Sequence, residues 1–163
     1  MKIFLVGLPG AGKTTIGRKL ALQLKYDFKD LDQMIEQICN ATIPQIFDQY
    51  GEDHFRALER DVLKGVVNGD HNVVVATGGG APCFHDGMDR MLKNGKTIFL
   101  DTPITEIIKR LEGQEQRPLL RGKNLDKNLS ELFRVRYPIY TKADFHIDGC
   151  NLDLNTIASL FKN

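Results

Sequence analysis

The segment Gly7–Thr14 has the residue types and the spacing that bind nucleotide phosphates. It reads GLPGAGKT, matches GxxxxGK[ST], follows an apolar run and opens a run with helical spacing. Glycines let backbone N–H groups close around phosphate oxygens, and the start of a helix adds a favourable dipole. Lys13 is expected to reach the β- and γ-phosphates, and the Thr14 hydroxyl to ligate Mg²⁺. The expected nucleotide contacts in this loop are Gly10, Ala11, Gly12, Lys13, Thr14 and Thr15.

Two carboxylates, Asp30 and Asp32, end the second expected strand, Asp27–Leu31. Side chains at i and i+2 of an extended segment point to the same side. One carboxylate is expected to help hold Mg²⁺ through water, and the other to accept a proton from a substrate hydroxyl. The alternative is that Asp32 only caps a helix expected from Gln33.

Three consecutive glycines, Gly78–Gly80, follow another apolar run. Such a run is costly in chain entropy and makes sense where the backbone must approach a ligand closely, although an ordinary turn is the alternative. Asp101 ends a further apolar run and competes as a metal ligand. Thr102 as a helix cap and Pro103 as the first helical residue explain that corner without a metal.

Two arginines stand out by their positions. Arg56 lies near the start of a helix, where a surface ion pair with Glu59 is the alternative to a binding role. Arg136 falls on the apolar stripe of its helix, three and four residues after Phe133 and Leu132. An arginine on an inward stripe needs an anionic partner, which can be a bound carboxylate or an internal acidic residue. Both readings stay open.

The polar segment Gly113–Asn124 lacks apolar periodicity and is expected to be a mobile lid. Arg117 in this lid is expected to contact the transferring phosphate, with Arg121 and Lys123 as competitors. Arg110, at the end of the preceding helix, is expected to stack on a base or to be a solvated surface residue.

Apolar strands alternate with helical patterns along the chain, which predicts a single α/β domain over residues 1–163. The fold class is a three-layer α/β/α sandwich with a five-stranded parallel sheet and ligands at the carboxyl ends of the strands. The expected strands are Lys2–Val6, Asp27–Leu31, Asn72–Ala76, Thr97–Leu100 and Phe145–Ile147. The expected helices are Lys13–Leu24, Gln33–Ile38, Pro44–Tyr50, Glu52–Val67, His85–Lys93, Pro103–Leu111, Leu125–Tyr140 and Leu154–Phe161.

Composition narrows the class of partners. Lys and Arg number 22 against 21 Asp and Glu, a net charge of +1, which argues against a nucleic-acid partner bound through a large basic field. No apolar run approaches the ~20 residues of a membrane span. Three scattered cysteines fit free thiols in a reducing cytoplasm, and the four histidines show no metal-binding spacing.

Taken in order along the chain, these motifs resemble the shikimate kinase family, which belongs to the P-loop kinases. The resemblance runs from Gly7 to about Tyr140. It rests on GLPGAGKT, Asp30-Leu31-Asp32, Gly51-Glu52 with Phe55-Arg56, Gly78-Gly79-Gly80, Arg117-Pro118-Leu119-Leu120 and Arg136-Tyr137-Pro138-Ile139-Tyr140. It implies transfer of the γ-phosphoryl group of ATP to the 3-hydroxyl of shikimate, in the biosynthesis of chorismate and aromatic amino acids.

The resemblance also implies roles for individual residues. The implied catalytic residues are Asp32, Lys13 and Arg117, and the implied metal-binding residues are Thr14 and Asp30. The implied shikimate-binding residues are Asp32, Arg56, Gly78, Gly79, Gly80 and Arg136. ATP is expected to contact Arg110 and Arg117 besides the phosphate loop. The implied strand order is 2-3-1-4-5, and the expected state is a cytoplasmic monomer.

Three other functions compete with this one. A gluconate kinase or a nucleoside monophosphate kinase would share the phosphate loop but accounts less well for the glycine run and the two arginines. A nucleotide-dependent switch is the remaining alternative, and its only sequence support is a near match to a guanine-binding motif at Thr141-Lys142-Ala143-Asp144.

Overall fold

The five strands of the described chain form one parallel sheet. The computed structural model describes residues 1–69, 72–111 and 124–161. The strands are β1 (Lys2–Val6), β2 (Asp27–Asp30), β3 (Val73–Ala76), β4 (Lys96–Asp101) and β5 (Phe145–Asp148). Their order is β2-β3-β1-β4-β5, with every neighbouring pair parallel, which confirms the expected fold class and strand order.

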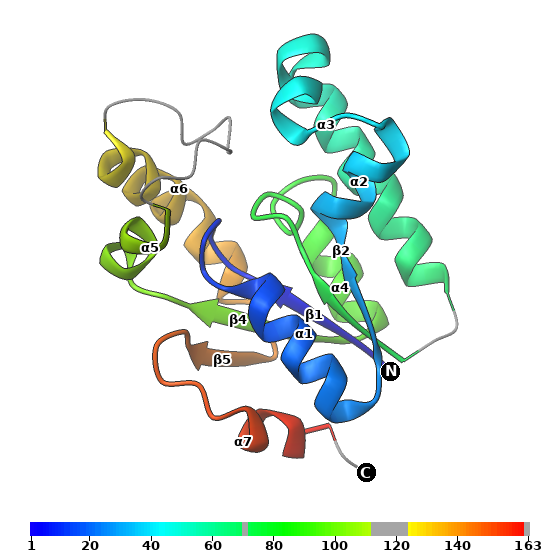
Figure 1. Cartoon of the computed structure of the whole chain (residues 1–163), viewed down its shortest axis with the longest axis vertical. Helices are drawn as coiled ribbons and strands as arrows, with labels where there is room; N and C mark the ends of the chain where they lie inside the picture. The colour runs from blue at the N-terminus through cyan, green and yellow to red at the C-terminus, as the bar shows by residue number, and fades with distance from the viewer. Residues whose placement is uncertain (70–71, 112–123, 162–163) are drawn as a thin grey trace.

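The helices cover both faces of this sheet (Figure 1). They are α1 (Lys13–Leu24), α2 (Leu31–Cys39), α3 (Ile43–Asn68), α4 (Gly87–Asn94), α5 (Ile104–Leu111), α6 (Leu125–Tyr140) and α7 (Leu154–Ser159). From β1 to β2 the chain moves toward one edge of the sheet, and at each later crossover it moves toward the other edge. Right-handed crossovers therefore place α1 on one face and α3, α4 and α6 on the opposite face, while α7 returns to pack beside α1.

The central strands are the core of the molecule. Ile3, Phe4, Leu5 and Val6 of β1 and the three valines of β3 are fully buried, because helices cover the sheet on both sides. With β1 in the middle of the sheet, the loop that follows it emerges between the ends of β3 and β4. The helices that follow the neighbouring strands β1 and β3 lie on opposite faces of the sheet, so the expected phosphate loop lies at a topological switch point, where such folds bind ligands.

The end of β2 differs from the expectation. The helix α2 begins at Leu31, because the Asp30 carboxylate accepts hydrogen bonds from the backbone N–H groups of Asp32 (3.1 Å) and Gln33 (3.3 Å). Asp30 is thus the helix cap, and the expectations that Asp32 is the cap or lies in an extended segment are wrong. Asp32 lies in the first turn of α2.

Two further details correct the expected elements. The helices expected before and after Gly51 are joined in α3, which breaks at Gly51 (φ 81°, ψ 175°). Thr102 does not cap α5, since its hydroxyl donates instead to the Ala11 carbonyl of the phosphate loop at 3.0 Å. Asp101 is exposed.

The near match to a guanine-binding motif has a structural explanation. The Asp144 carboxylate accepts hydrogen bonds from the backbone N–H (2.8 Å) and the hydroxyl (2.9 Å) of Thr97, and so fastens the turn before β5 to β4. The expected lid, Gly113–Asn124, falls almost entirely on residues 112–123, which lie outside the described residues, and so does Arg117. No helix in the described part of the chain is long and apolar enough to span a membrane.

Candidate active site

The phosphate loop lines a cavity of about 380 Å³ at the carboxyl end of β1. Lys13 is almost fully buried, and its Nζ donates to the carbonyl oxygens of Gly7 and Leu8, both at 2.8 Å. These bonds hold the ammonium group inside the loop. The cavity is lined by Gly10, Gly12, Lys13, Thr14, Thr15, Asp30, Asp32, Thr77, Arg110 and Leu111. The structure thus brings the expected loop residues together with both carboxylates.

Arg110 is half-buried and contacts this loop. Its Nη1 donates to the Ala11 carbonyl at 3.2 Å, and its Nε donates to Glu106 at 3.2 Å. Thr102 donates to the same Ala11 carbonyl. The back of the phosphate loop is therefore fixed by α5. The Arg110 side chain remains 35% exposed, and its contact with a base stays a prediction.

Thr14 and Asp30 form a direct contact between α1 and β2. The Thr14 hydroxyl donates to Asp30 Oδ2 at 2.6 Å, while Asp30 Oδ1 caps α2. Because the hydroxyl proton is committed to Asp30, the lone pairs of Thr14 Oγ1 are left for a cation. In the described part of the chain no group of three or more His, Cys, Asp or Glu residues could hold a metal. Magnesium usually takes one or two protein oxygens and completes its shell with water and phosphate, so this pair fits Mg²⁺.

The three glycines after β3 are required by space and not by backbone conformation, since none of them has a positive φ. A Cβ at Gly78 would lie 2.5 Å from Glu59 Oε1 and 2.7 Å from Asp32 Oδ1. At Gly80 it would overlap the guanidinium of Arg56, and at Gly79 it would lie 3.1 Å from Nη1 of Arg136. Gly78 and Gly80 therefore make room for charged side chains from other elements, while the nearest atom to a Cβ at Gly79 would be Cδ of Pro9 in the phosphate loop, at 2.9 Å. This close approach gathers Asp32, Arg56 and Arg136 around one turn.

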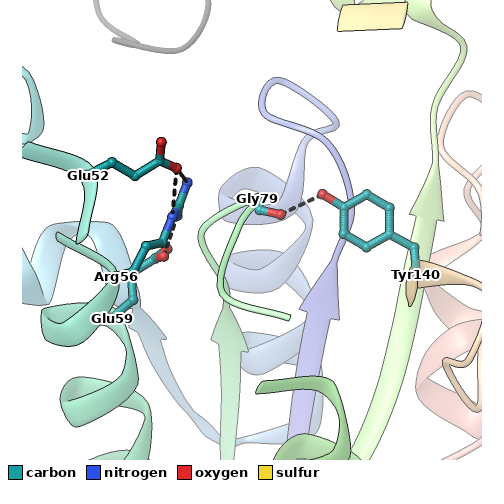
Figure 2. A network of polar contacts seen from close by, with 5 residues as sticks. All are labelled: Glu52, Arg56, Glu59, Gly79 and Tyr140. Atoms are coloured by element: carbon teal, nitrogen blue, oxygen red, sulfur yellow. Dashed lines mark hydrogen bonds and ion pairs between the residues drawn. The ribbon is translucent and has the colours of Figure 1, made fainter. Parts of the chain in front are cut away.

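Arg56 lies between two glutamates of its own helix (Figure 2). Its Nη1 donates to Glu59, and its Nε and Nη2 donate to Glu52 Oε1 at 3.1 and 2.9 Å. The ring of Phe84 covers the guanidinium, with the ring centroid 4.4 Å from Cζ. Arg56 and Glu59 are 4% and 3% exposed, so the pair expected at the surface is buried.

Burial raises the pKa of Glu59 from its ordinary 4.5 to about 7. The positive charge of Arg56 opposes this effect, and the negative charge of Asp32 adds to it. A carboxyl group that titrates near neutral pH thus lies beside both Arg56 and Asp32. Sequence reasoning did not assign a site role to Glu59, and its position three residues after Arg56 was the available signal.

Arg136 lies on the other side of the glycine turn and is also 4% exposed. It forms no ion pair with any described residue, and Glu59 acts on it only through longer-range attraction, so within the described residues there is no internal salt bridge to Arg136. Tyr140, one helical turn further along α6, donates its hydroxyl to the Gly79 carbonyl at 2.6 Å (Figure 2). Sequence reasoning gave Tyr140 no role beyond its place at the end of the expected helix and of the last motif, because nothing in a sequence shows where a buried hydroxyl finds its acceptor.

Comparisons with known proteins agree on one family. The sequence model of the family described as shikimate kinase matches residues 9–161. The shikimate kinase of Bacteroides thetaiotaomicron is 41% identical over 157 residues, which cover 94% of this chain and 89% of that protein. The solved shikimate kinase from Acinetobacter baumannii in complex with shikimate superposes with a TM-score of 0.91 at 36% identity, over 98% of this chain and 89% of that one.

A more distant likeness shows the fold alone. The deoxyadenosine kinase from M. mycoides with bound dATP has a TM-score of 0.60 at 18% identity, over 99% of this chain and 97% of that one. The family match, in contrast, spans nearly the whole chain and includes the phosphate loop, the glycine turn and both buried arginines. By these matches the chain belongs to the shikimate kinase family of P-loop kinases.

Proposed function

We propose that this chain transfers the γ-phosphoryl group of ATP to the 3-hydroxyl of shikimate. The observation that carries the choice of acceptor is Arg136, a buried guanidinium with no acidic partner in the described chain, beside a turn that begins where the phosphate cavity ends. A planar guanidinium binds a carboxylate through two parallel hydrogen bonds. Shikimate carries one carboxylate and is the substrate that gives its name to the family.

The roles of the acceptor site follow from its geometry. Arg136 and Arg56 hold the carboxylate of shikimate from opposite sides of the Gly78–Gly80 turn. Asp32 lines both the cavity and this turn, so it faces the hydroxyl that attacks the γ-phosphorus. The new bond forms between that oxygen and phosphorus, the bond from phosphorus to the β–γ bridging oxygen breaks, and the hydroxyl proton passes to Asp32 as ADP leaves.

The donor site is the phosphate loop with Thr14, Lys13 and Asp30. Lys13 binds the β- and γ-phosphates, and Thr14, oriented by Asp30, supplies an oxygen ligand to Mg²⁺. When bound, Mg²⁺ neutralises charge on the phosphate oxygens. Asp30 acts through Thr14 and through water, because both of its oxygens already accept hydrogen bonds. The proposal also includes a contact between Arg117 and the transferring phosphate. It further includes a mobile lid over residues 113–124, and a protein that is cytoplasmic and monomeric.

The test is to titrate shikimate and ATP separately against wild type, Arg136→Ala and Arg136→Lys. A charge-assisted hydrogen bond contributes about 1.5–3 kcal/mol, so Arg136→Ala should weaken shikimate binding by about 10- to 100-fold and leave ATP binding within about twofold. Arg136→Lys should restore only part of the affinity, because an ammonium group lacks the planar fork. Arg134→Ala, which changes an exposed arginine of the same helix, is the control.

Turnover tests the reaction itself. Wild type should release ADP in the presence of ATP, Mg²⁺ and shikimate, and not when gluconate or nucleoside monophosphates replace shikimate. Asp32→Asn should lower kcat by about 10²- to 10⁴-fold, because an amide cannot accept the proton. Release of ADP independent of shikimate, or an Arg136→Ala variant that weakens both ligands equally, would contradict the proposal.

A further inference from the structure

Within the described residues, Tyr140 makes the one hydrogen bond that ties the glycine turn to α6. Its hydroxyl donates to the Gly79 carbonyl at 2.6 Å across 61 positions of sequence, and the side chain of Tyr140 is fully buried. The carbonyls of Gly78 and Gly80 accept only from their near neighbours, the N–H groups of Ala81 and Cys83. Among the described contacts, therefore, Gly79 has the one carbonyl of the turn that accepts a hydrogen bond from a side chain of another element.

This bond fixes more than one atom. A peptide unit is planar and trans, so the Gly79 carbonyl and the Gly80 N–H lie in one plane and point in opposite directions. Holding the carbonyl against Tyr140 therefore also fixes the direction in which the Gly80 N–H donates. Glycine samples more backbone conformations than any other residue, so three in a row have little else to keep this plane from rotating.

The same bond sets the position of the turn relative to Arg136. Tyr140 and Arg136 are four residues apart on α6, on its buried face. Nη1 of Arg136 lies close to Gly79, since a Cβ at that position would be 3.1 Å from it and 2.9 Å from Cδ of Pro9. The ring of Tyr140 also packs against Phe99 of β4, with ring centroids 5.3 Å apart, while its hydroxyl is held by the Gly79 carbonyl. The Tyr140 hydroxyl thus holds the glycine turn at a fixed position relative to the Arg136 guanidinium.

We propose that Tyr140 is a positioning residue for shikimate, whose hydroxyl holds the Gly78–Gly80 turn in the one conformation that accepts the substrate carboxylate beside Arg136. This inference rests on the proposed function of the site. Burial raises the pKa of Tyr140 above its ordinary range, so the hydroxyl keeps its proton and remains a donor throughout the pH range of an assay.

The test is Tyr140→Phe, which removes only the hydroxyl. Loss of one buried hydrogen bond should raise the KM for shikimate by about 5- to 20-fold, since the turn then samples conformations that do not bind. The KM for ATP and kcat should stay within about twofold, because the phosphate loop is fixed by other residues. In the same variant, amide hydrogen exchange at residues 78–80 should become faster.

Two variants separate this role from packing. Tyr137→Phe removes a partly exposed hydroxyl of the same helix and should change nothing. Phe99→Leu loosens the packing of the Tyr140 ring but keeps its hydroxyl, so it should lower the melting temperature while the KM for shikimate stays near that of wild type. Equal changes in both KM values for Tyr140→Phe, or an unchanged KM for shikimate, would overturn the inference. Arg136→Ala in the same assay reports on the proposed site independently, so failure of Tyr140 alone leaves that site intact.

Discussion

At the scale of single residues, the site is built from buried charges that share partners. Glu59 contacts Arg56, lies beside Asp32 across Gly78, and is itself almost fully buried. Removing such a carboxylate from water disfavours its ionised form, while Arg56 favours it. The outcome is a carboxyl group whose pKa is raised to about 7 in the folded protein.

This shift predicts a pH dependence of stability that Glu59→Gln should remove. The folded state holds the proton of Glu59 more tightly than the unfolded state, whose pKa is near 4.5. The contribution of Glu59 is therefore fully present below pH 4.5, declines as the pH rises to about 7, and is constant above that. Urea unfolding at several pH values should show this decline in wild type relative to Glu59→Gln.

The control is Asp61→Asn on the same helix. Asp61 is exposed, and its hydrogen bond from Arg60 lowers its pKa, so its contribution has the opposite sign and is lost as the pH falls. A wild-type curve that runs parallel to the Glu59→Gln curve from pH 4.5 to 7 would mean that Glu59 is ionised throughout.

At the scale of elements, the break in α3 sets the position of the part of the helix that carries Glu52, Arg56 and Glu59. Gly51 has φ 81° and ψ 175°, a region that is open almost only to glycine. The next residue, Glu52, starts the straight part of the helix and pairs with Arg56 one turn later. The break thus sets where this second part of α3 begins and which way it presents Arg56.

Two substitutions to alanine on α3 should have opposite effects on stability. Gly51→Ala should lower the free energy of unfolding by about 1–3 kcal/mol, since the strain arises from φ and ψ alone and no atom lies within 4 Å of the new Cβ. Gly65→Ala, at an exposed helical position with equally open space, should raise it by about 0.4–1 kcal/mol. Denaturant unfolding measures both, and the same sign for the two variants would show that Gly51 is not strained.

How far the sequence predicts the structure depends on the range of the interaction. Apolar periodicity located the strands and the described helices to within two residues, because each buried stripe is a local pattern. The sequence did not predict the cap at Asp30 or the bond from Thr102 to Ala11. Each of these side chains has more than one possible partner, and the one it bonds depends on which lies nearest in the folded chain. The buried Glu59 and the Tyr140 hydroxyl were missed for the same reason. The resemblance to the shikimate kinase family brought Asp32, Arg56 and Arg136 into one hypothesis, and the fold places all three around the glycine turn.

At the scale of the whole molecule, the strand order separates the two ligands. The phosphate loop extends from β1, while the acceptor side is formed by the turn after β3 together with α3 and α6. The two sites share Asp32 and little else among the described residues. Each ligand should therefore stabilise the fold through its own set of contacts.

This separation predicts how ligands shift thermal unfolding. At about 100 times its Kd, a ligand adds roughly 2.7 kcal/mol to the free energy of unfolding. Shikimate and a non-hydrolysable ATP analogue with Mg²⁺ should each raise the melting temperature of wild type. In Arg136→Ala, whose affinity for shikimate should be about 10- to 100-fold lower, the increment from the same concentration of shikimate should fall to roughly 0.4–1.4 kcal/mol. The increment from the nucleotide should remain, as scanning fluorimetry can measure. Loss of both increments would indicate one merged site.

The thiol beside the two arginines has a practical consequence for labelling. Burial raises the pKa of Cys83 to about 11, so at pH 8 roughly one such thiol in a thousand is ionised and ready to attack an alkylating reagent. Cys150, in contrast, is exposed in the turn after β5. A maleimide dye should therefore attach at Cys150 well before it reaches Cys83. The third thiol, Cys39 at the end of α2, is partly buried, so Cys150 is the exposed thiol that can carry a fluorescent reporter at the far edge of the sheet.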